Sequence, residues 1–187
     1  PDSRLTPEIM WWLGEYYSRQ NDLSLARRYF SSIIQDFPKS NLVPDAYYVL
    51  GSISSDEAKY EEAIGNFKKV VELGKSDLTA QAQIAIAGIY VKQEEPELAL
   101  TTYKGVVNEY SNLAHLIYPK IADIYRKLGD LEQALGFYRQ SLEVVPVRQM
   151  PEIQFMAAEI RQAQGKPDEA IEEYLKVTYL YSEKNDL

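Results

Sequence analysis

The chain has 187 residues, of which 45% are hydrophobic, and a net charge of −8. This hydrophobic share is typical of a folded protein and too high for a disordered one. The acidic balance argues against nucleic acid as a partner, because phosphate-binding proteins carry a basic face. No apolar run approaches the roughly 20 residues that span a bilayer, so direct membrane insertion is not expected. The absence of cysteine excludes disulfides, thiolate metal sites and cysteine nucleophiles.

The first ten residues, PDSRLTPEIM, show neither an initiator methionine nor the basic-then-apolar pattern of a secretion signal. We therefore expect the sequence to be a fragment of a longer protein or a processed chain. The compartment does not follow from this observation.

An internal period runs through the chain and is marked by five alanines. Their spacings are 37, 36, 35 and 36 residues, and an aromatic residue follows each alanine by four positions. Thirteen positions before each alanine comes an aliphatic residue or alanine, followed at once by glycine or alanine. The marker alanines are Ala26, Ala63, Ala99, Ala134 and Ala170, and the aromatic residues are Phe30, Phe67, Tyr103, Tyr138 and Tyr174. Residues four apart share one face of a helix, so this pattern predicts a repeated helical unit.

Each unit is expected to contain two amphipathic helices of about 14 residues joined by a short polar break. We place the units at 7–40, 44–77, 80–113, 115–148 and 151–184 in a single array. Asn21, Gly129 and Gly165 suit the left-handed conformation that ends a helix, and Pro96 and Pro167 suit a first helical turn. Gly14 and Gly51 predict that the two helices of a hairpin approach closely, beside the large residue that follows each alanine.

The first unit resembles the tetratricopeptide repeat (TPR) family, whose pattern is W-x2-L-G-x2-Y, then A-x3-F, then P. Met10 replaces the first anchor, and Leu13, Gly14, Tyr17, Ala26, Phe30 and Pro38 match the others. The resemblance covers residues 7–184 and degrades in the last unit, where Ala157 and Arg161 stand at anchor positions. A Sel1-like array is the nearest rival, but its glycine-rich turn is missing. The resemblance implies an all-α, right-handed superhelical solenoid of about five hairpins and ten helices.

The stretch QDFPKSNLVPDAYYVLG, residues 35–51, looks like bacterial envelope members of the family. Similar segments occur in an outer-membrane assembly lipoprotein and in the Tol–Pal accessory protein. This likeness favours the bacterial periplasm or cell envelope over the cytoplasm.

The resemblance also implies that one side of each first helix lines a concave groove. In MWWLGEYY, residues 10–17, Met10, Leu13, Gly14 and Tyr17 are expected in the core, Tyr16 beside a neighbouring helix, and Trp12 at the groove edge or exposed. The predicted groove is a row of large apolar groups flanked mainly by carboxylates. Its residues are Glu8, Trp11, Glu15, Asp45, Tyr48, Ser52, Ile84, Lys120, Asp123, Phe155 and Glu159.

Such a groove predicts a non-catalytic scaffold that binds a protein or peptide segment. Aromatic anchors supply contact area at low entropic cost, and carboxylates favour a basic or apolar ligand over an acidic one. Members that hold the C-terminal carboxylate of heat-shock chaperones use lysine and asparagine on this surface. Because Trp11, Glu15, Tyr48 and Ser52 stand there instead, we expect no such clamp. Ordinary packing of these side chains along the inner surface remains the alternative interpretation.

The sequence offers no constellation for catalysis, a metal or a cofactor. His115 is the only histidine and is interpreted as a capping or surface residue. No phosphate-binding glycine loop or nucleophile elbow occurs, and no pair of carboxylates stands out among the 28 acidic residues. We therefore expect neither enzymatic activity nor a cofactor.

The last helix carries apolar residues over much of its surface near its end, including Ile171, Leu175 and Tyr179. Either the chain was cut from a longer array, or a partner or a second copy covers this face. The alternative to groove binding is therefore a structural spacer, or an array that self-associates through the terminal helix.

Overall fold

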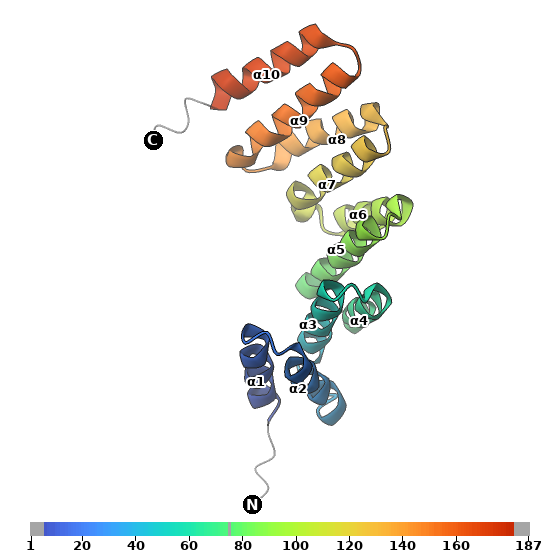
Figure 1. Ribbon diagram of the computed structural model, residues 1–187, viewed down its shortest axis with the longest axis vertical. Coiled ribbons are helices and arrows are strands. Elements are labelled where there is room, and N and C mark those ends of the chain that lie inside the picture. Colours follow the sequence, from blue (N-terminus) through green and yellow to red (C-terminus); the bar gives the residue numbers. More distant parts are fainter. Residues whose placement is uncertain (1–5, 75, 182–187) are drawn as a thin grey trace, which may run out of the picture. The chain divides into compact units, whose positions relative to one another are not determined.

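The computed structural model describes residues 6–74 and 76–181, and Figure 1 traces their helices in chain order. Within these ranges the secondary structure consists of ten α-helices and two short 3-10 turns, with no strand. The all-α prediction is therefore confirmed. By its internal packing the chain divides into two compact units whose boundary falls between Thr102 and Tyr103.

The first unit contains five complete helices and the first half of a sixth. The helices are α1 (Pro7–Arg19), α2 (Leu23–Asp36), α3 (Val43–Asp56), α4 (Tyr60–Leu73), α5 (Ser76–Lys92) and α6 (Pro96–Glu109). Successive helices pack against each other from α1 to α5, and α3 also touches α5.

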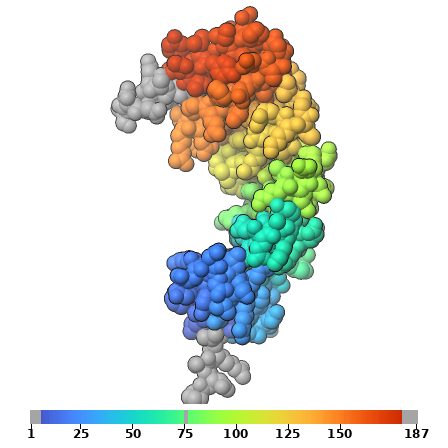
Figure 2. Space-filling view, viewed as in Figure 1, coloured from blue at the N-terminus to red at the C-terminus, as the bar shows by residue number. Residues whose placement is uncertain are grey.

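The second unit begins within α6 and is built from two further hairpins. It contains η1 (Ser111–Leu113), α7 (Ala114–Lys127), α8 (Leu131–Val144), η2 (Val147–Gln149), α9 (Met150–Ala163) and α10 (Pro167–Tyr181). Helix α8 packs on α7 and α9, and α10 packs on α9. Figure 2 shows the surface of the same chain, coloured by residue number.

Left-handed residues and side-chain caps make the tight turns inside the hairpins. Asn21, Gly129 and Gly165 have φ angles of 59°, 78° and 74°, as predicted. Asp22, which follows Asn21, accepts a hydrogen bond from the backbone N–H of Leu25 at 3.1 Å, and Asp130 repeats this cap in α8. Helix starts at Pro96 and Pro167 also follow the prediction, because a first-turn proline sacrifices no intrahelical hydrogen bond.

Glycine in the first helix makes room for the ring of the second helix, as the sequence predicted. A Cβ atom added to Gly14 would lie 2.7 Å from Cζ of Phe30, and one added to Gly51 would lie 2.9 Å from Cε1 of Phe67. Both rings are almost fully buried. The hairpin therefore closes onto a ring that occupies the space of the missing side chain.

Two of the five hairpins replace a half-buried tyrosine by a polar residue. Tyr17 stacks on Tyr29 at a ring-centroid distance of 5.7 Å, and Tyr125 stacks on Phe137 at the same distance. Ser54 and Arg161 stand at the equivalent position in α3 and α9, and both are buried.

At Ser54 the smaller side chain admits a guanidinium group from the preceding hairpin. Arg27 lies 3.1 Å from the Ser54 hydroxyl, 2.7 Å from Glu57 and 2.6 Å from Glu62. Ser54 also donates a hydrogen bond to the carbonyl of Leu50. This polar cluster joins α2 to the hairpin formed by α3 and α4.

The glycine contact can be tested within one hairpin. We expect Gly51→Ala to lower the free energy of unfolding by about 1–2 kcal/mol, because overpacking at the Phe67 ring outweighs the gain in helix propensity. The matched control is Gly65→Ala in α4, where an added Cβ has nothing within 4 Å. That change should stabilise the protein by about 0.5–1 kcal/mol. Urea unfolding followed by circular dichroism measures both, and equal shifts for the two variants would contradict the close approach.

The Arg27 cluster predicts a pH dependence of stability. Arg27 lowers the pKa of Glu62, and Lys59 together with Arg27 lowers that of Glu57, both from an ordinary value of 4.5. A lowered folded-state pKa contributes stability above the unfolded value that is lost as pH falls through the folded one. Arg27→Met should therefore flatten the loss of stability below about pH 5. The exposed neighbour provides the control Arg28→Met, which should keep the wild-type slope in unfolding experiments from neutral to acidic pH.

Candidate functional site

In the first unit, the predicted anchors Trp11 and Tyr48 lie half-buried against core rings. Trp11 meets Phe30 edge-on at 5.1 Å between ring centroids, and Tyr48 meets Phe67 in the same way at 5.3 Å. Each pair is separated by 19 residues in the sequence. Burial also raises the pKa of the Tyr48 hydroxyl. These side chains are thus held in place by the core while part of their surface remains accessible.

The row continues onto α5, where Ile84 is also half-buried. Because α3 touches α5, the helices that carry Tyr48 and Ile84 are neighbours. Ser52, one turn after Tyr48, donates its hydroxyl to the Tyr48 carbonyl at 3.1 Å. That hydroxyl is therefore hydrogen-bonded within its own helix.

Glu8 and Glu15 border two different hollows on the first hairpin. Glu8 is exposed in the first turn of α1, and hydrogen bonds from its own backbone N–H and from Thr6 lower its pKa. It borders a hollow formed with the loop 36–41 that follows α2. Glu15 borders a second hollow, which also contains Arg19. Asp45 is half-buried in the first turn of α3. Glu8 and Glu15 therefore lie on the first hairpin, and Asp45 lies on the second.

In the second unit, Asp123 is engaged by neighbouring side chains. The buried Tyr138 donates its hydroxyl to Asp123, and Arg126 lies 3.6 Å away. Burial and this hydrogen bond raise the pKa of Tyr138. The Tyr138 hydroxyl raises the pKa of Arg126, and the charges of Asp123 and Glu159 add to that effect. Part of the predicted acidic flank is therefore neutralised here by the protein itself.

The remaining predicted residues of this unit, Lys120, Phe155 and Glu159, are all exposed. Phe155 packs on Tyr174 at 5.3 Å, with the same separation of 19 residues as in the first unit. The exposed fraction of Phe155 is 44%. An exposed aromatic side chain packed on a ring of the second helix therefore recurs in α9, although Tyr174 is only half-buried.

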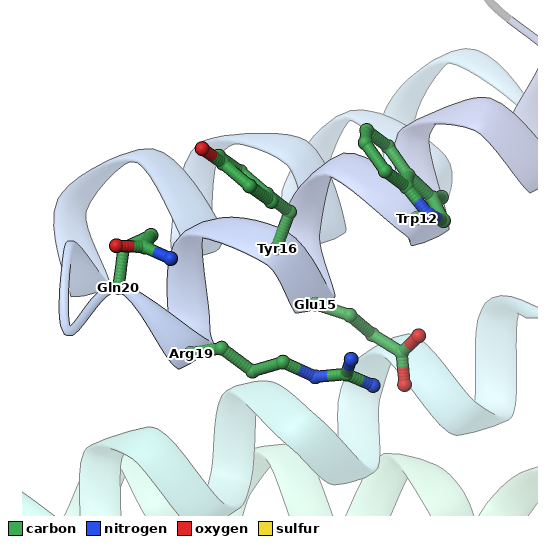
Figure 3. Close-up of a pocket in the computed structure, with 5 residues that line it drawn as sticks. All are labelled: Trp12, Glu15, Tyr16, Arg19 and Gln20. Atoms are coloured by element: carbon green, nitrogen blue, oxygen red, sulfur yellow. The ribbon is translucent and has the colours of Figure 1, made fainter.

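The sequence prediction did not recognise a surface formed by Ile9, Trp12 and Tyr16 on α1. Trp12 is 61% exposed and stacks on Tyr16, with ring centroids 5.6 Å apart. Figure 3 shows both rings on one side of α1, while Glu15 and Arg19 extend toward one another nearby. The spacing 9, 12, 16 could have revealed this surface, because residues three or four apart share a helix face. Tyr16, expected beside a neighbouring helix, instead stacks on its own helix.

His115 lies in the first turn of α7, and its Nδ1 atom is 2.9 Å from the carbonyl oxygen of Asn112. This contact is made with the preceding 3-10 turn, and α7 has no side-chain cap at its N-terminus, so the structure does not support the predicted capping role. Among the described side chains, no group of three or more metal-ligating residues gathers. None of the helices described here is both long and apolar enough to cross a membrane.

Sequence profiles described as tetratricopeptide repeat match residues 8–40, 44–76, 120–149 and 151–184. These segments cover more than half of the chain. The chain therefore belongs to the tetratricopeptide repeat family. No sequence relative was found among curated proteins.

Solved structures share the fold at low sequence identity. MamA is 18% identical, with a TM-score of 0.76 over 97% of this chain and 96% of that chain. PilF from Pseudomonas aeruginosa is 12% identical, with a TM-score of 0.71 over 95% and 77% of the two chains. YrrB, described as a TPR protein with an unusual peptide-binding site, is 19% identical, with a TM-score of 0.67 over 94% and 87%. The tetratricopeptide repeats support the assignment of the chain as a protein–protein interaction scaffold.

The hydrogen bond from Tyr138 to Asp123 predicts a measurable contribution to stability. We expect Tyr138→Phe to lower the free energy of unfolding by about 1–2 kcal/mol, because a hydrogen bond to a charged group is lost while the ring remains. The hydroxyl of the equivalent Tyr174 makes an exposed hydrogen bond of 3.3 Å to Gln162. Tyr174→Phe should therefore lower the free energy of unfolding by less than about 0.5 kcal/mol. Denaturant unfolding of both variants measures the two losses in stability. Equal losses would show that the contact with Asp123 does not stabilise the fold.

Proposed function

We propose that the chain binds a protein or peptide segment on the first helices of its hairpins, without catalysing a reaction on it. The observation that carries this proposal is the repeated packing of a partly exposed aromatic side chain on a ring 19 residues later in the sequence, at Trp11, Tyr48 and Phe155. Rigid, partly exposed aromatic side chains lose little entropy when a ligand covers them. The description of YrrB as a peptide-binding TPR protein supports the same use of the fold.

The proposed ligand is basic or apolar rather than acidic. The chain carries a net charge of −8, and Glu15, Asp45 and Glu159 accompany the three aromatic anchors along the first helices. A basic segment would be attracted by this charge and an acidic one repelled. Asp123 contributes less to this selection, because Tyr138 and Arg126 already engage it.

A random peptide library selected on the immobilised chain would test this proposal. We expect enriched sequences that combine arginine or lysine with apolar residues. For a selected peptide, Tyr48→Ala should weaken binding by at least about tenfold in fluorescence polarisation, because loss of a hot spot costs more than about 1.4 kcal/mol. Glu15→Gln should weaken the binding of a basic peptide by a smaller factor. Added salt should reduce the difference in affinity between this variant and wild type.

The control is Leu73→Ala, which removes a half-exposed apolar side chain at the end of α4. It should leave peptide affinity unchanged. All variants need to keep the helical circular dichroism signal, because Tyr48 also packs on Phe67. Failure to enrich any peptide, or equal affinities for wild type and Tyr48→Ala, would contradict binding at this surface.

A further inference from the structure

Helices α1 and α10 each present an apolar face to solvent. On α1 the exposed fractions of Ile9, Trp12 and Tyr16 are 46%, 61% and 45%. On α10 Ile171, Leu175 and Tyr179 are 54%, 45% and 69% exposed. Apolar side chains spaced by three or four residues form a continuous stripe on a helix. Each terminal helix therefore carries an apolar surface that the described part of the chain leaves uncovered.

The α1 stripe occupies positions that are buried in other hairpins. The residues equivalent to Ile9 and Tyr16 are no more than 6% exposed in α3, α5 and α9, where the second helix of the preceding hairpin packs on them. These residues are Ala46 and Ile53, Ala82 and Ile89, and Ile153 and Ile160. The α1 stripe therefore matches the face that receives a second helix of a hairpin.

One residue of the α10 stripe, Ile171, occupies a position that packs against the next hairpin elsewhere in the chain. Leu135 in α8, the equivalent of Ile171, is only 2% exposed and belongs to the core that α8 shares with α9. Ile64 in α4 similarly packs into the core shared with α5. Ile171 therefore belongs to a face on which the first helix of a hairpin packs. Leu175 adds an apolar group where α4 and α8 carry Lys68 and Arg139.

A polar contact recurs at two of the junctions between hairpins and gives them a register. The side-chain amide of Gln93 donates to Glu61 at 3.4 Å, and that of Gln164 donates to Glu132 at 2.8 Å. In both contacts the glutamine directly follows the first helix of a hairpin, and the glutamate lies in the first turn of the preceding second helix.

The two halves of this contact also occur on the two terminal helices. Gln20 directly follows α1, and Asp168 lies in the first turn of α10. Both side chains are exposed. The apolar stripes and this polar pair thus supply both sides of a junction like those inside the chain.

We propose that the occupant of the α1 face is the α10 face of a second copy of this chain, with Gln20 of one copy donating to Asp168 of the other. Ile171 then packs against the stripe of Ile9, Trp12 and Tyr16. The contact is head-to-tail, because it joins two different faces of the same chain. This association does not depend on the proposed peptide-binding surface.

The first test is a concentration series in the analytical ultracentrifuge. Wild type should increase in mass with concentration, whereas Trp12→Glu/Tyr16→Glu and Ile171→Glu/Leu175→Glu should each stay monomeric. A mixture of these two variants should form a one-to-one dimer and nothing larger, because one intact α1 face and one intact α10 face remain. Leu73→Glu, at an exposed apolar side chain elsewhere, should associate like wild type.

Three outcomes would overturn the proposal. They are a wild type that stays monomeric at submillimolar concentration, a double variant that still self-associates, and a mixture that stays monomeric. The third outcome is read only for variants that keep the wild-type circular dichroism spectrum.

Disulfide trapping gives a second measurement with milder substitutions. Since the chain has no cysteine, Gln20→Cys and Asp168→Cys can be made on separate molecules. Mild oxidation of their mixture should give mostly mixed dimers, while either variant alone should give few, because a disulfide forms only between closely placed Cβ atoms. Efficient trapping of Gln20→Cys with itself would indicate a symmetric α1–α1 contact and overturn the head-to-tail arrangement.

Discussion

The contact between a small residue on the first helix and a large ring on the second determines how each hairpin closes. Phe30 fills the space above Gly14, and Phe67 fills the space above Gly51. These rings in turn pack against Trp11 and Tyr48, whose side chains are half-buried. A change at the glycine would therefore move both the helix spacing and the candidate binding residues, because close-packed interiors transmit such shifts.

Polar groups in the core form contacts both between hairpins and within one hairpin. Ser54 admits Arg27 from the preceding hairpin, and Tyr138 directs its hydroxyl to Asp123. Both clusters place charge beside apolar packing, where partners are needed to offset desolvation. The same residues that vary the repeat pattern thus determine which surface charges remain available to a ligand.

The sequence predicted the all-α repeat fold because the pattern depends on local geometry. The alanine period, Asn21, Gly129 and the first-turn prolines each specify a helix face, an end or a start within a few residues. The left-handed Ala58 and Glu94, with φ of 57° and 60°, were not predicted, because neither residue type favours that conformation. There the pairing of the flanking helices overrides the local preference.

Sequence periodicity by itself determined the family and the helices. It did not determine how the candidate binding side chains are used, because their contacts join residues on different helices. Only the tertiary structure showed that Trp11 is fixed by Phe30 and that Asp123 is engaged by Tyr138. It alone distinguished the stripe on α1 from its buried counterparts, because exposure depends on which helix packs above a residue rather than on the residue itself.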